Sequence, residues 1–428
     1  MRIAAAVALL VLGLLPGGTA STAGAATPVD RTGGAAAAAA AADTWRPPRG
    51  QVFNNPTGTR EARLRIIARV HAAIAHTPAG GVIRIATYNI GLRSSADLLL
   101  RAHARGVRVQ VVVNDNLVGD LEARLQRRLG SNPYGSSFLV ICRASCRNGS
   151  SVGNMHLKVY SFSKTGAASN VIISSSSNLG GPAAFKQWND AYTTDGDREF
   201  FDAWRALFRQ LSLDRAVSPR RVTYTTTDLT IAFQRHLART RTTTTSSGDA
   251  VYHRLRGIGC RAPAGFGDGS GRTLVTVNMY AWYGDRGERL ARLLAAHRRN
   301  GCNVRVIGSL ASDDVVRILR GAGIPVRAAD WDWGRRLSTS GDKYVYGPRC
   351  YSHLKFATVS GSYLGQGTKL VWTGSENWSA PALSSDEVTY EIRDAQVFQA
   401  YNRQWLAMWQ SPRATHRPYV RPTSSPCP

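Results

Sequence analysis

The chain contains little lysine, little acidic charge and little cysteine for its length. Of its 428 residues, 54 are Lys or Arg and 28 are Asp or Glu, and only six of the basic residues are lysines. Six cysteines in so long a chain exclude a small disulfide knot, and the composition excludes a collagen and a coiled coil. An apolar fraction of 43% is too high for a disordered polybasic tail, so we expect two folded domains of ordinary size.

The formal charge of +26 is carried almost entirely by arginine, of which there are 48. Such an excess over lysine is typical of codon bias in a GC-rich genome, which would place arginine wherever a surface cation is tolerated. The alternative is attraction to polyanions, meaning nucleic acid, anionic lipid headgroups or a cell wall. The charge alone supports both interpretations equally.

Long apolar runs are absent beyond the first residues, so no segment has the roughly 18 apolar residues that a membrane-spanning helix needs. At the N-terminus, Arg2 precedes an apolar run over residues 3–15 and the small-residue segment 23–25. This pattern predicts a secretory signal peptide that is cleaved near Ala25. We therefore expect a secreted, extracellular protein without a transmembrane segment.

Export favours disulfides over metal binding for the six cysteines. The sequence has no CxxC pair and no Cys/His cluster at ligand spacing, so we expect no metal and no cofactor. Cys142 and Cys146 are near enough in sequence to close a small loop. Cys260 and Cys302 flank strand-like runs and form the second expected pair.

Helix-like and strand-like segments alternate along the chain. Residues 60–76 have apolar side chains at helical spacing, and a Pro/Gly break separates them from the strand-like run 82–88. A second helix over residues 95–105 ends at Gly106, before a strand over 107–113. This order predicts an α/β layer structure.

The second half of the chain repeats the first. His156-Leu157-Lys158 recurs as His353-Leu354-Lys355, and Phe201 to Trp204 recurs as Phe398 to Tyr401, both 197 residues later. A nearly constant offset indicates internal duplication, with a Thr- and Arg-rich stretch between the copies. The expected parts are a signal peptide (1–25), a disordered Ala/Gly-rich leader (26–45), an N-terminal half (46–219), a linker or ordered surface excursion (220–250) and a C-terminal half (251–428).

Each half contains a histidine and a lysine two residues apart, followed by a segment with serine and asparagine. Residues i and i+2 of a strand point to the same face, so each pair would project together. Nine histidines and six lysines predict well under one such pair by chance. The residues are His156, Lys158, Ser176 and Asn178 in the first half and His353, Lys355, Ser375 and Asn377 in the second.

These groups suit phosphoryl transfer without a metal. One imidazole can attack phosphorus and form a covalent intermediate, while a second protonates the leaving oxygen. Two lysines and two asparagines would hold the non-bridging oxygens and the charge that develops on them. Two half-sites that meet across a pseudo-twofold axis would make one active site, which explains why the motif occurs twice.

The motifs resemble those of the phospholipase D superfamily, in which HxK is followed by Asp and then by a GSxN segment. The second copy matches better, with His353-Leu354-Lys355 and Gly374-Ser375-Glu376-Asn377, whereas serine replaces the motif glycine in the first copy. The Asp position holds Ser163 and Ser360. In the superfamily this Asp is mainly structural, and the tyrosyl-DNA phosphodiesterase branch lacks it, so catalysis is not excluded.

The resemblance implies two α/β/α sandwich halves of the phospholipase D type, related by a pseudo-twofold axis, with one active site at their interface. It implies that His156 is the nucleophile and His353 the general acid, although the near-symmetry leaves the swapped roles open. It also implies an acidic residue that orients each histidine from the opposite half. We expect Asp190 to pair with His353 and Glu387 with His156, with Asp386 as a competing choice. The expected phosphate-binding residues are Lys158, Lys355, Asn178, Asn377, Ser176 and Ser375.

Three functions are consistent with these residues. The first is a secreted phospholipase D that hydrolyses phospholipid headgroup phosphodiesters, with transient membrane-surface contact. The second is a nuclease or nucleic-acid phosphodiesterase of the same superfamily, favoured by the positive charge and the missing Asp. The third is a non-catalytic polyanion-binding protein. Because one chain carries both half-sites, we expect a monomer.

Overall fold

The structure, a computed structural model, describes residues 43–428 except 149–151, 219–221, 234–247, 335 and 341–342. The expected signal peptide and leader residues 26–42 lie outside the described residues. Asp43 and Trp45 both contact His76, through a 2.7 Å ion pair and a ring stack with centroids 4.4 Å apart. The folded part therefore includes residues that we had assigned to the leader, because Trp45 has an aromatic partner.

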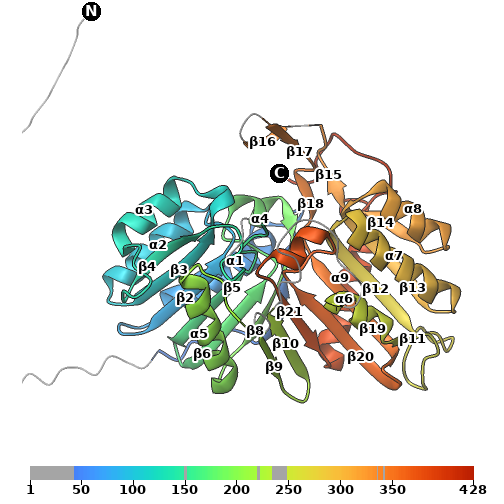
Figure 1. Cartoon of the computed structure of the whole chain (residues 1–428), viewed down its shortest axis with the longest axis horizontal. Helices are drawn as coiled ribbons and strands as arrows, with labels where there is room; N and C mark the ends of the chain where they lie inside the picture. Colours follow the sequence, from blue (N-terminus) through green and yellow to red (C-terminus); the bar gives the residue numbers. More distant parts are fainter. Residues whose placement is uncertain (1–42, 149–151, 219–221, 234–247, 335, 341–342) are drawn as a thin grey trace, which may run out of the picture. The chain divides into compact units, whose positions relative to one another are not determined.

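A seven-stranded sheet forms the centre of the N-terminal half, drawn in blue to green in Figure 1. Its strands are β1 (Gly50–Phe53), β2 (Val82–Thr87), β3 (Arg108–Asn114), β4 (Phe138–Cys142), β5 (Val159–Thr165), β6 (Ala168–Ser175) and β8 (Asp190–Thr194). They are ordered β1-β8-β6-β5-β2-β3-β4, with β2, β3 and β4 parallel and the other neighbours antiparallel. Most of β3 is buried, as is usual for parallel strands with helices on both faces.

The C-terminal half, in yellow to red, is built on a nine-stranded sheet. Its strands are β9 (Val222–Thr225), β10 (Leu229–Phe233), β11 (Ile258–Gly259), β12 (Leu274–Trp282), β13 (Asn303–Ala311), β14 (Val326–Ala328), β19 (Lys355–Tyr363), β20 (Gln366–Gly374) and β21 (Val388–Ile392). The order is β14-β13-β12-β19-β20-β21-β10-β9, and β11 pairs with β19. Six strands thus follow the same order as β4-β3-β2-β5-β6-β8 of the first sheet, which confirms the predicted duplication.

Equivalent helices cover equivalent faces of the two sheets. They are α1 (Arg60–Ala75), α2 (Arg93–Ala104), α3 (Asp120–Leu129) and α5 (Arg198–Ser212) in the first half, and α6 (Ala250–Arg256), α7 (Gly284–Arg299), α8 (Asp313–Gly321) and α9 (Ala395–Gln410) in the second. The first three of each set pack on one face in a core of their own. Each half is therefore an α/β/α sandwich, as expected.

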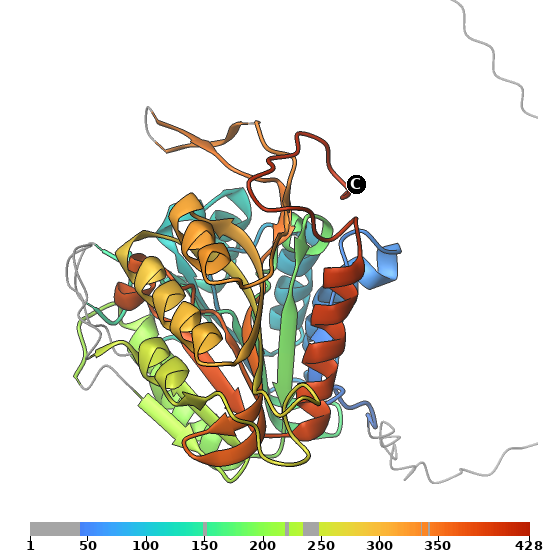
Figure 2. The ribbon, with the colours of Figure 1, turned by 90° about the vertical axis from the view of Figure 1, so that its right-hand side faces the viewer.

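The helices α5 and α9 join the two halves. Asp197 caps the N-terminus of α5 and Asp394 that of α9, at the same 197-residue offset as the histidines. Trp204 of α5 and Trp405 of α9 are buried in one apolar core that includes residues of both sheets. Helix α9 also contacts β1 of the first half, and α5 contacts β9 of the second. Figure 2 shows α9, in red, from the side.

Short elements complete the interface and the surface. A three-stranded sheet of β15 (Asp330–Trp331), β18 (Cys350–Ser352) and β7 (Gln187–Trp188) crosses from one half to the other. The remaining elements are η1 (Asp115–Leu117), α4 (Gly181–Phe185), β16 (Arg336–Ser340), β17 (Lys343–Tyr346) and η3 (Ala380–Ser384).

Of the two interpretations of residues 220–250, a linker is wrong over residues 222–233, which form ordered strands. Strands β9 and β10 form a hairpin, and β10 pairs with β21 and so extends the C-terminal sheet. Ile231 and Phe233 alternate along β10 and are buried, so the end of this hairpin is anchored in the core, while residues 225–228 at its turn are exposed. Residues 234–247 of the expected linker lie outside the described residues.

Both predicted disulfides are present. Cys142 is bonded to Cys146 and Cys260 to Cys302, while the third disulfide joins Cys350 to Cys427 and ties the C-terminal tail to β18. Within the described part of the chain, none of the helices is both long and apolar enough to cross a membrane.

Candidate active site

The two histidine motifs meet at the interface between the halves. His156 precedes β5, and its backbone N–H donates to the Asp386 carbonyl of the other half at 3.0 Å. His353 precedes β19, and its N–H donates in the same way to the Trp188 carbonyl at 2.9 Å. Burial, together with the charges of Lys158 and Lys355, holds the pKa of both imidazoles well below 6.5. Each motif is therefore held by the opposite half.

The two lysines are buried beside their histidines. Each ammonium donates at 2.6 Å to the backbone carbonyl of the histidine two residues before it. Lys158 lies 5.5 Å from the ring centroid of Tyr88, and Lys355 lies 4.5 Å from that of Tyr280. Burial lowers the pKa of Lys158 to about 7, and burial with the charge of Lys158 lowers that of Lys355 strongly. An anion that binds between them would relieve this cost.

Glu387 contacts His156 from the opposite half, at the place expected for the orienting acid. Its carboxylate oxygens lie 2.9 and 3.1 Å from Nδ1 of His156 across the interface, and the Ser375 hydroxyl donates to the same carboxylate. Burial raises the pKa of Glu387, while the charge of Lys158 and the hydrogen bond from Ser375 oppose this shift and favour the carboxylate. A carboxylate on Nδ1 fixes the tautomer in which Nε2 carries the lone pair.

The prediction that Asp190 orients His353 is wrong. Nδ1 of His353 lies 3.0 Å from the side-chain oxygen of Asn189, so an amide takes the position that we expected for a carboxylate. Asp190 instead accepts hydrogen bonds from Thr373 and, at 2.7 Å, from the Tyr401 hydroxyl, and its charge acts on Lys355. Asp190 begins β8, and its side chain turns toward α9 because Tyr401 offers a donor there.

The competing choice, Asp386, is the residue that corresponds to Asn189 in the repeat. It accepts a hydrogen bond from the Ser145 hydroxyl at 3.1 Å, inside the loop closed by the Cys142–Cys146 disulfide. The two histidines thus have different partners in otherwise equivalent half-sites.

Neither motif serine is available to bind phosphate as predicted. The Ser176 hydroxyl donates to the Asn189 oxygen at 3.0 Å, and the Ser375 hydroxyl donates to Glu387. Both serines are fully buried, and their backbone N–H groups donate to carbonyls of Asp190 and Val388. Each serine therefore positions the group that orients a histidine.

The motif asparagines are held by their carbonyl oxygens. Thr87 donates to Oδ1 of Asn178 at 3.3 Å, and the backbone N–H of Ala281 donates to Oδ1 of Asn377 at 3.4 Å. Both side chains are partly exposed. This arrangement leaves each amide nitrogen as the donor for an anionic oxygen.

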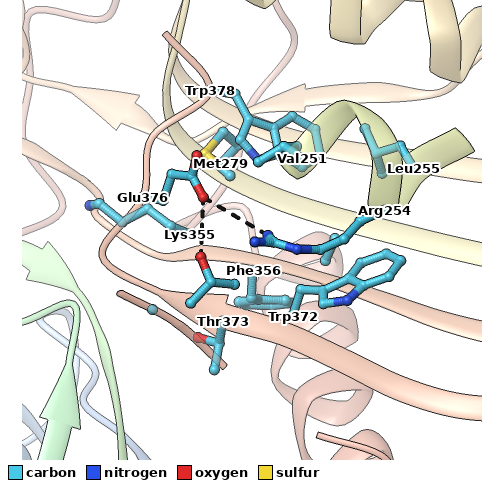
Figure 3. A pocket seen from close by; sticks show the side chains of 13 residues that line it. Val251, Arg254, Leu255, Met279, Lys355, Phe356, Trp372, Thr373, Glu376 and Trp378 are labelled. Carbon is cyan, nitrogen blue, oxygen red and sulfur yellow. Dashed lines mark hydrogen bonds and ion pairs between the residues drawn. The ribbon is translucent and has the colours of Figure 1, made fainter. Parts of the chain in front are cut away.

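The turn that carries Asn377 rests on a buried ion cluster. Arg286 is fully buried and donates to the carbonyls of Asn377 and Ser379 at 2.9 and 3.1 Å, and it is paired with Asp249 and Glu376. Figure 3 shows Glu376 between Lys355 and Arg254, in a pocket lined by Trp372 and Trp378. These charged residues position the motif.

Sequence reasoning missed several of these groups. Tyr88 and Tyr280 lie near the ends of the equivalent strands β2 and β12, so the repeat contained a signal for them. Asn189 lies directly before Asp190, but only the fold distinguishes the two. Nothing in the sequence links Arg286 to Asn377, because their contact depends on the packing of α7.

The family model described as "Cardiolipin synthase, PLD-like domain", where PLD denotes phospholipase D, matches residues 76–212 and 270–409. The two matches cover more than half of the chain and coincide with the two halves. The chain belongs to the phospholipase D superfamily.

Two solved structures share this fold. A polyphosphate kinase from Porphyromonas gingivalis is 15% identical over 88% of this chain and 53% of its own, with a TM-score of 0.52. The chain thus spans about half the length of that kinase. A phosphatidylserine synthase from Haemophilus influenzae Rd KW20 is 12% identical over 86% of this chain and 87% of its own, also with a TM-score of 0.52. No curated protein matches the sequence.

Ser163 and Ser360 occupy the Asp position of the phospholipase D motif, and both act structurally. The Ser163 hydroxyl accepts a hydrogen bond from the backbone N–H of Val82 at 2.9 Å. The Ser360 hydroxyl accepts one from Gly267 at 3.0 Å. Each serine ties its strand to a neighbouring loop or strand start.

Two groups of side chains in the described residues have metal-ligand atoms close together. They are Cys260, His297 and Cys302, and Cys142, Cys146 and Asp386. In each group the two sulfurs form a disulfide, so neither offers thiolate ligands in this state.

Proposed function

We propose that this protein is a secreted phosphodiesterase that hydrolyses phospholipid headgroup phosphodiesters without a metal. The convergence of two His-Lys pairs from two halves at one buried interface carries the proposal. Export rests on the signal-like segment 1–25 and fits the three disulfides. The phospholipid substrate is supported by the matching family, whose name refers to a synthase of the phospholipid cardiolipin.

In the first step, Nε2 of His156 attacks phosphorus as the bond to the headgroup oxygen breaks. His353, which carries a proton on both ring nitrogens when the phosphodiester is bound, gives its Nε2 proton to that oxygen, so the headgroup leaves as a neutral hydroxyl and a phosphohistidine remains. In the second step, His353 takes a proton from water, the resulting hydroxide attacks phosphorus, and the bond to His156 breaks. The lysine ammoniums and asparagine amides hold the non-bridging oxygens throughout.

The unequal histidine partners support these roles. The Glu387 carboxylate stabilises the positive charge that His156 acquires when it bonds to phosphorus. Asn189 is uncharged and holds the His353 ring without raising its basicity, which suits a group that must release its proton. The swapped assignment would place the uncharged partner on the nucleophile.

A nucleic-acid phosphodiesterase is the second candidate, because the same chemistry cleaves a polynucleotide and the chain carries a charge of +26. The experiment compares phosphatidylcholine vesicles with single- and double-stranded DNA in EDTA, with His156→Ala and His353→Ala as controls. Headgroup release without DNA cleavage is the expected result. DNA cleavage alone would establish the second candidate, and turnover that disappears on chelation would refute the metal-free mechanism.

A further inference from the structure

A second concentration of positive charge lies on the N-terminal half, away from the histidines. It is a pocket of about 1130 Å³, including the part open to solvent. We call it the arginine hollow, and the lining residues that define it are Arg84, Arg108, Tyr134, Asp202, Arg205 and Arg209.

The charge of the arginine hollow is not balanced. Its carboxylate, Asp202, lies 3.4 Å from Arg205 and 3.8 Å from Arg198, so two guanidinium groups already share it. Among the residues that the structure describes, none forms a hydrogen bond or an ion pair with the Arg84 guanidinium. Burial, together with the charges of Arg205 and Arg108, lowers the pKa of Arg84 to about 10. A half-buried cation without a counterion costs free energy, and an incoming anion would recover part of it.

Beside the guanidinium groups lies an exposed aromatic ring. Tyr134 is 66% exposed, and the Arg209 guanidinium lies 4.7 Å from its ring centroid, so one face of the ring is supported. A ring in this position is a platform on which a planar base can stack. Guanidinium groups hold phosphate oxygens through paired N–H donors. The hollow thus offers both parts of a nucleotide site.

The arginine hollow lies at the opposite end of the strands from the histidines. Tyr88, which follows β2 and lies beside His156, marks the end of the strand nearest the histidines. Arg84 precedes Tyr88 by four residues, and Arg108 pairs with Val82, which precedes Tyr88 by six. At roughly 3.3 Å per residue these spacings are about 13 and 20 Å along β2. A flat membrane surface that presents lipid to the histidines would not reach the hollow at the same time. A small phosphate ligand or a flexible strand would.

We propose that the arginine hollow binds a nucleotide unit, with its phosphate between the guanidinium groups and its base stacked on Tyr134. The unit comes either from a free nucleotide or from single-stranded nucleic acid. The site is separate from the catalytic histidines, and the proposal does not depend on the reaction proposed above.

The test measures binding of a short fluorescein-labelled oligothymidylate to the full chain by anisotropy in EDTA, in a His156→Ala background that prevents turnover. Joint replacement of Arg84 and Arg205 by Met should weaken binding by about 10- to 100-fold and lower the salt dependence. Arg403→Met, a change at an exposed arginine of α9, is the matched control and should alter affinity by less than about twofold.

Tyr134→Ala is a second variant, whose exposed position keeps folding intact. It should weaken the oligonucleotide about tenfold and leave pyrophosphate binding unchanged. Adenosine diphosphate and unlabelled oligothymidylate are then compared as competitors of the labelled strand. If both compete equally well per phosphate, a free nucleotide is enough to fill the site, and a strand is not required.

Unchanged oligonucleotide affinity in the arginine and tyrosine variants would overturn the proposal. The proposal would also be overturned, in favour of a membrane contact, if these variants lost binding to vesicles of phosphatidylcholine with phosphatidylglycerol but still bound the oligonucleotide. Turnover of a chromogenic phosphodiester by the same variants with His156 restored should be unchanged. An inactive parent protein would count against the proposed reaction and not against the hollow.

Discussion

Replacing Lys158 by methionine should abolish activity and stabilise the protein. The ammonium is buried, and its pKa falls from 10.5 to about 7 on folding. Because the folded-state pKa is the lower one, the charged side chain destabilises the fold fully below pH 7, and this cost fades as the pH rises toward 10.5. Methionine keeps the stem and removes the charge.

The size of the effect follows from the pKa difference. At about 1.4 kcal/mol per pH unit, a shift from 10.5 to about 7 costs about 5 kcal/mol at pH 6 and about 2 kcal/mol at pH 9. Loss of the hydrogen bond to the His156 carbonyl offsets about 1 kcal/mol. The expected gain in unfolding free energy is therefore about 4 kcal/mol at pH 6 and about 1 kcal/mol at pH 9.

The assay is guanidinium-induced unfolding followed by tryptophan fluorescence, in buffers without phosphate, because a bound anion would stabilise the native state by mass action. Lys164→Met is the control, since Lys164 lies exposed on the following strand, and it should change stability by less than about 0.5 kcal/mol. A gain that does not depend on pH, or a loss of stability at pH 6, would refute the reasoning.

Three further predictions concern the groups around the histidines. Glu387→Gln should lower kcat by about 10³-fold with little change in KM, measured with a chromogenic phosphodiester, because the amide no longer stabilises the charged His156; an unchanged kcat would contradict its role. Asn189→Asp should move the alkaline limb of the kcat profile up by about one pH unit or more, since a carboxylate raises the pKa of His353; an unmoved profile would argue against that contact. Arg286→Met should cost about 3–5 kcal/mol in denaturant unfolding, because two buried carboxylates lose their partner.

The repeat made much of this structure predictable from the sequence. A constant offset identified the two halves, and the paired His-Lys spacing identified the site. The same offset wrongly predicted equivalent roles for the two acidic residues, because it identifies equivalent backbone positions and not the direction in which a side chain points. Asp190 and Glu387 occupy equivalent positions, yet Tyr401 draws one into the core while Ser375 holds the other against His156.

Other groups were beyond sequence reasoning because their roles arise from packing. The hydroxyl of a motif serine could bind a phosphate or another group of the protein. The burial of Ser176 and Ser375 shows that both hydroxyls bind protein groups, and the sequence does not reveal this burial. The hairpin of β9 and β10 has a composition typical of a linker, and its role depends on the open edge of β21.

The histidine contacts across the interface bear on how the molecule arose. If the ancestor was a single half that paired with a copy of itself, both histidines necessarily had identical neighbours, and any substitution changed both sites at once. Fusion into one chain removed that restriction. Position 189 could then diverge from position 386, and position 190 from position 387, so that one imidazole faces a charge and the other an amide. The covalent joining of the halves is thus what allows a division of labour between two imidazoles with the same origin.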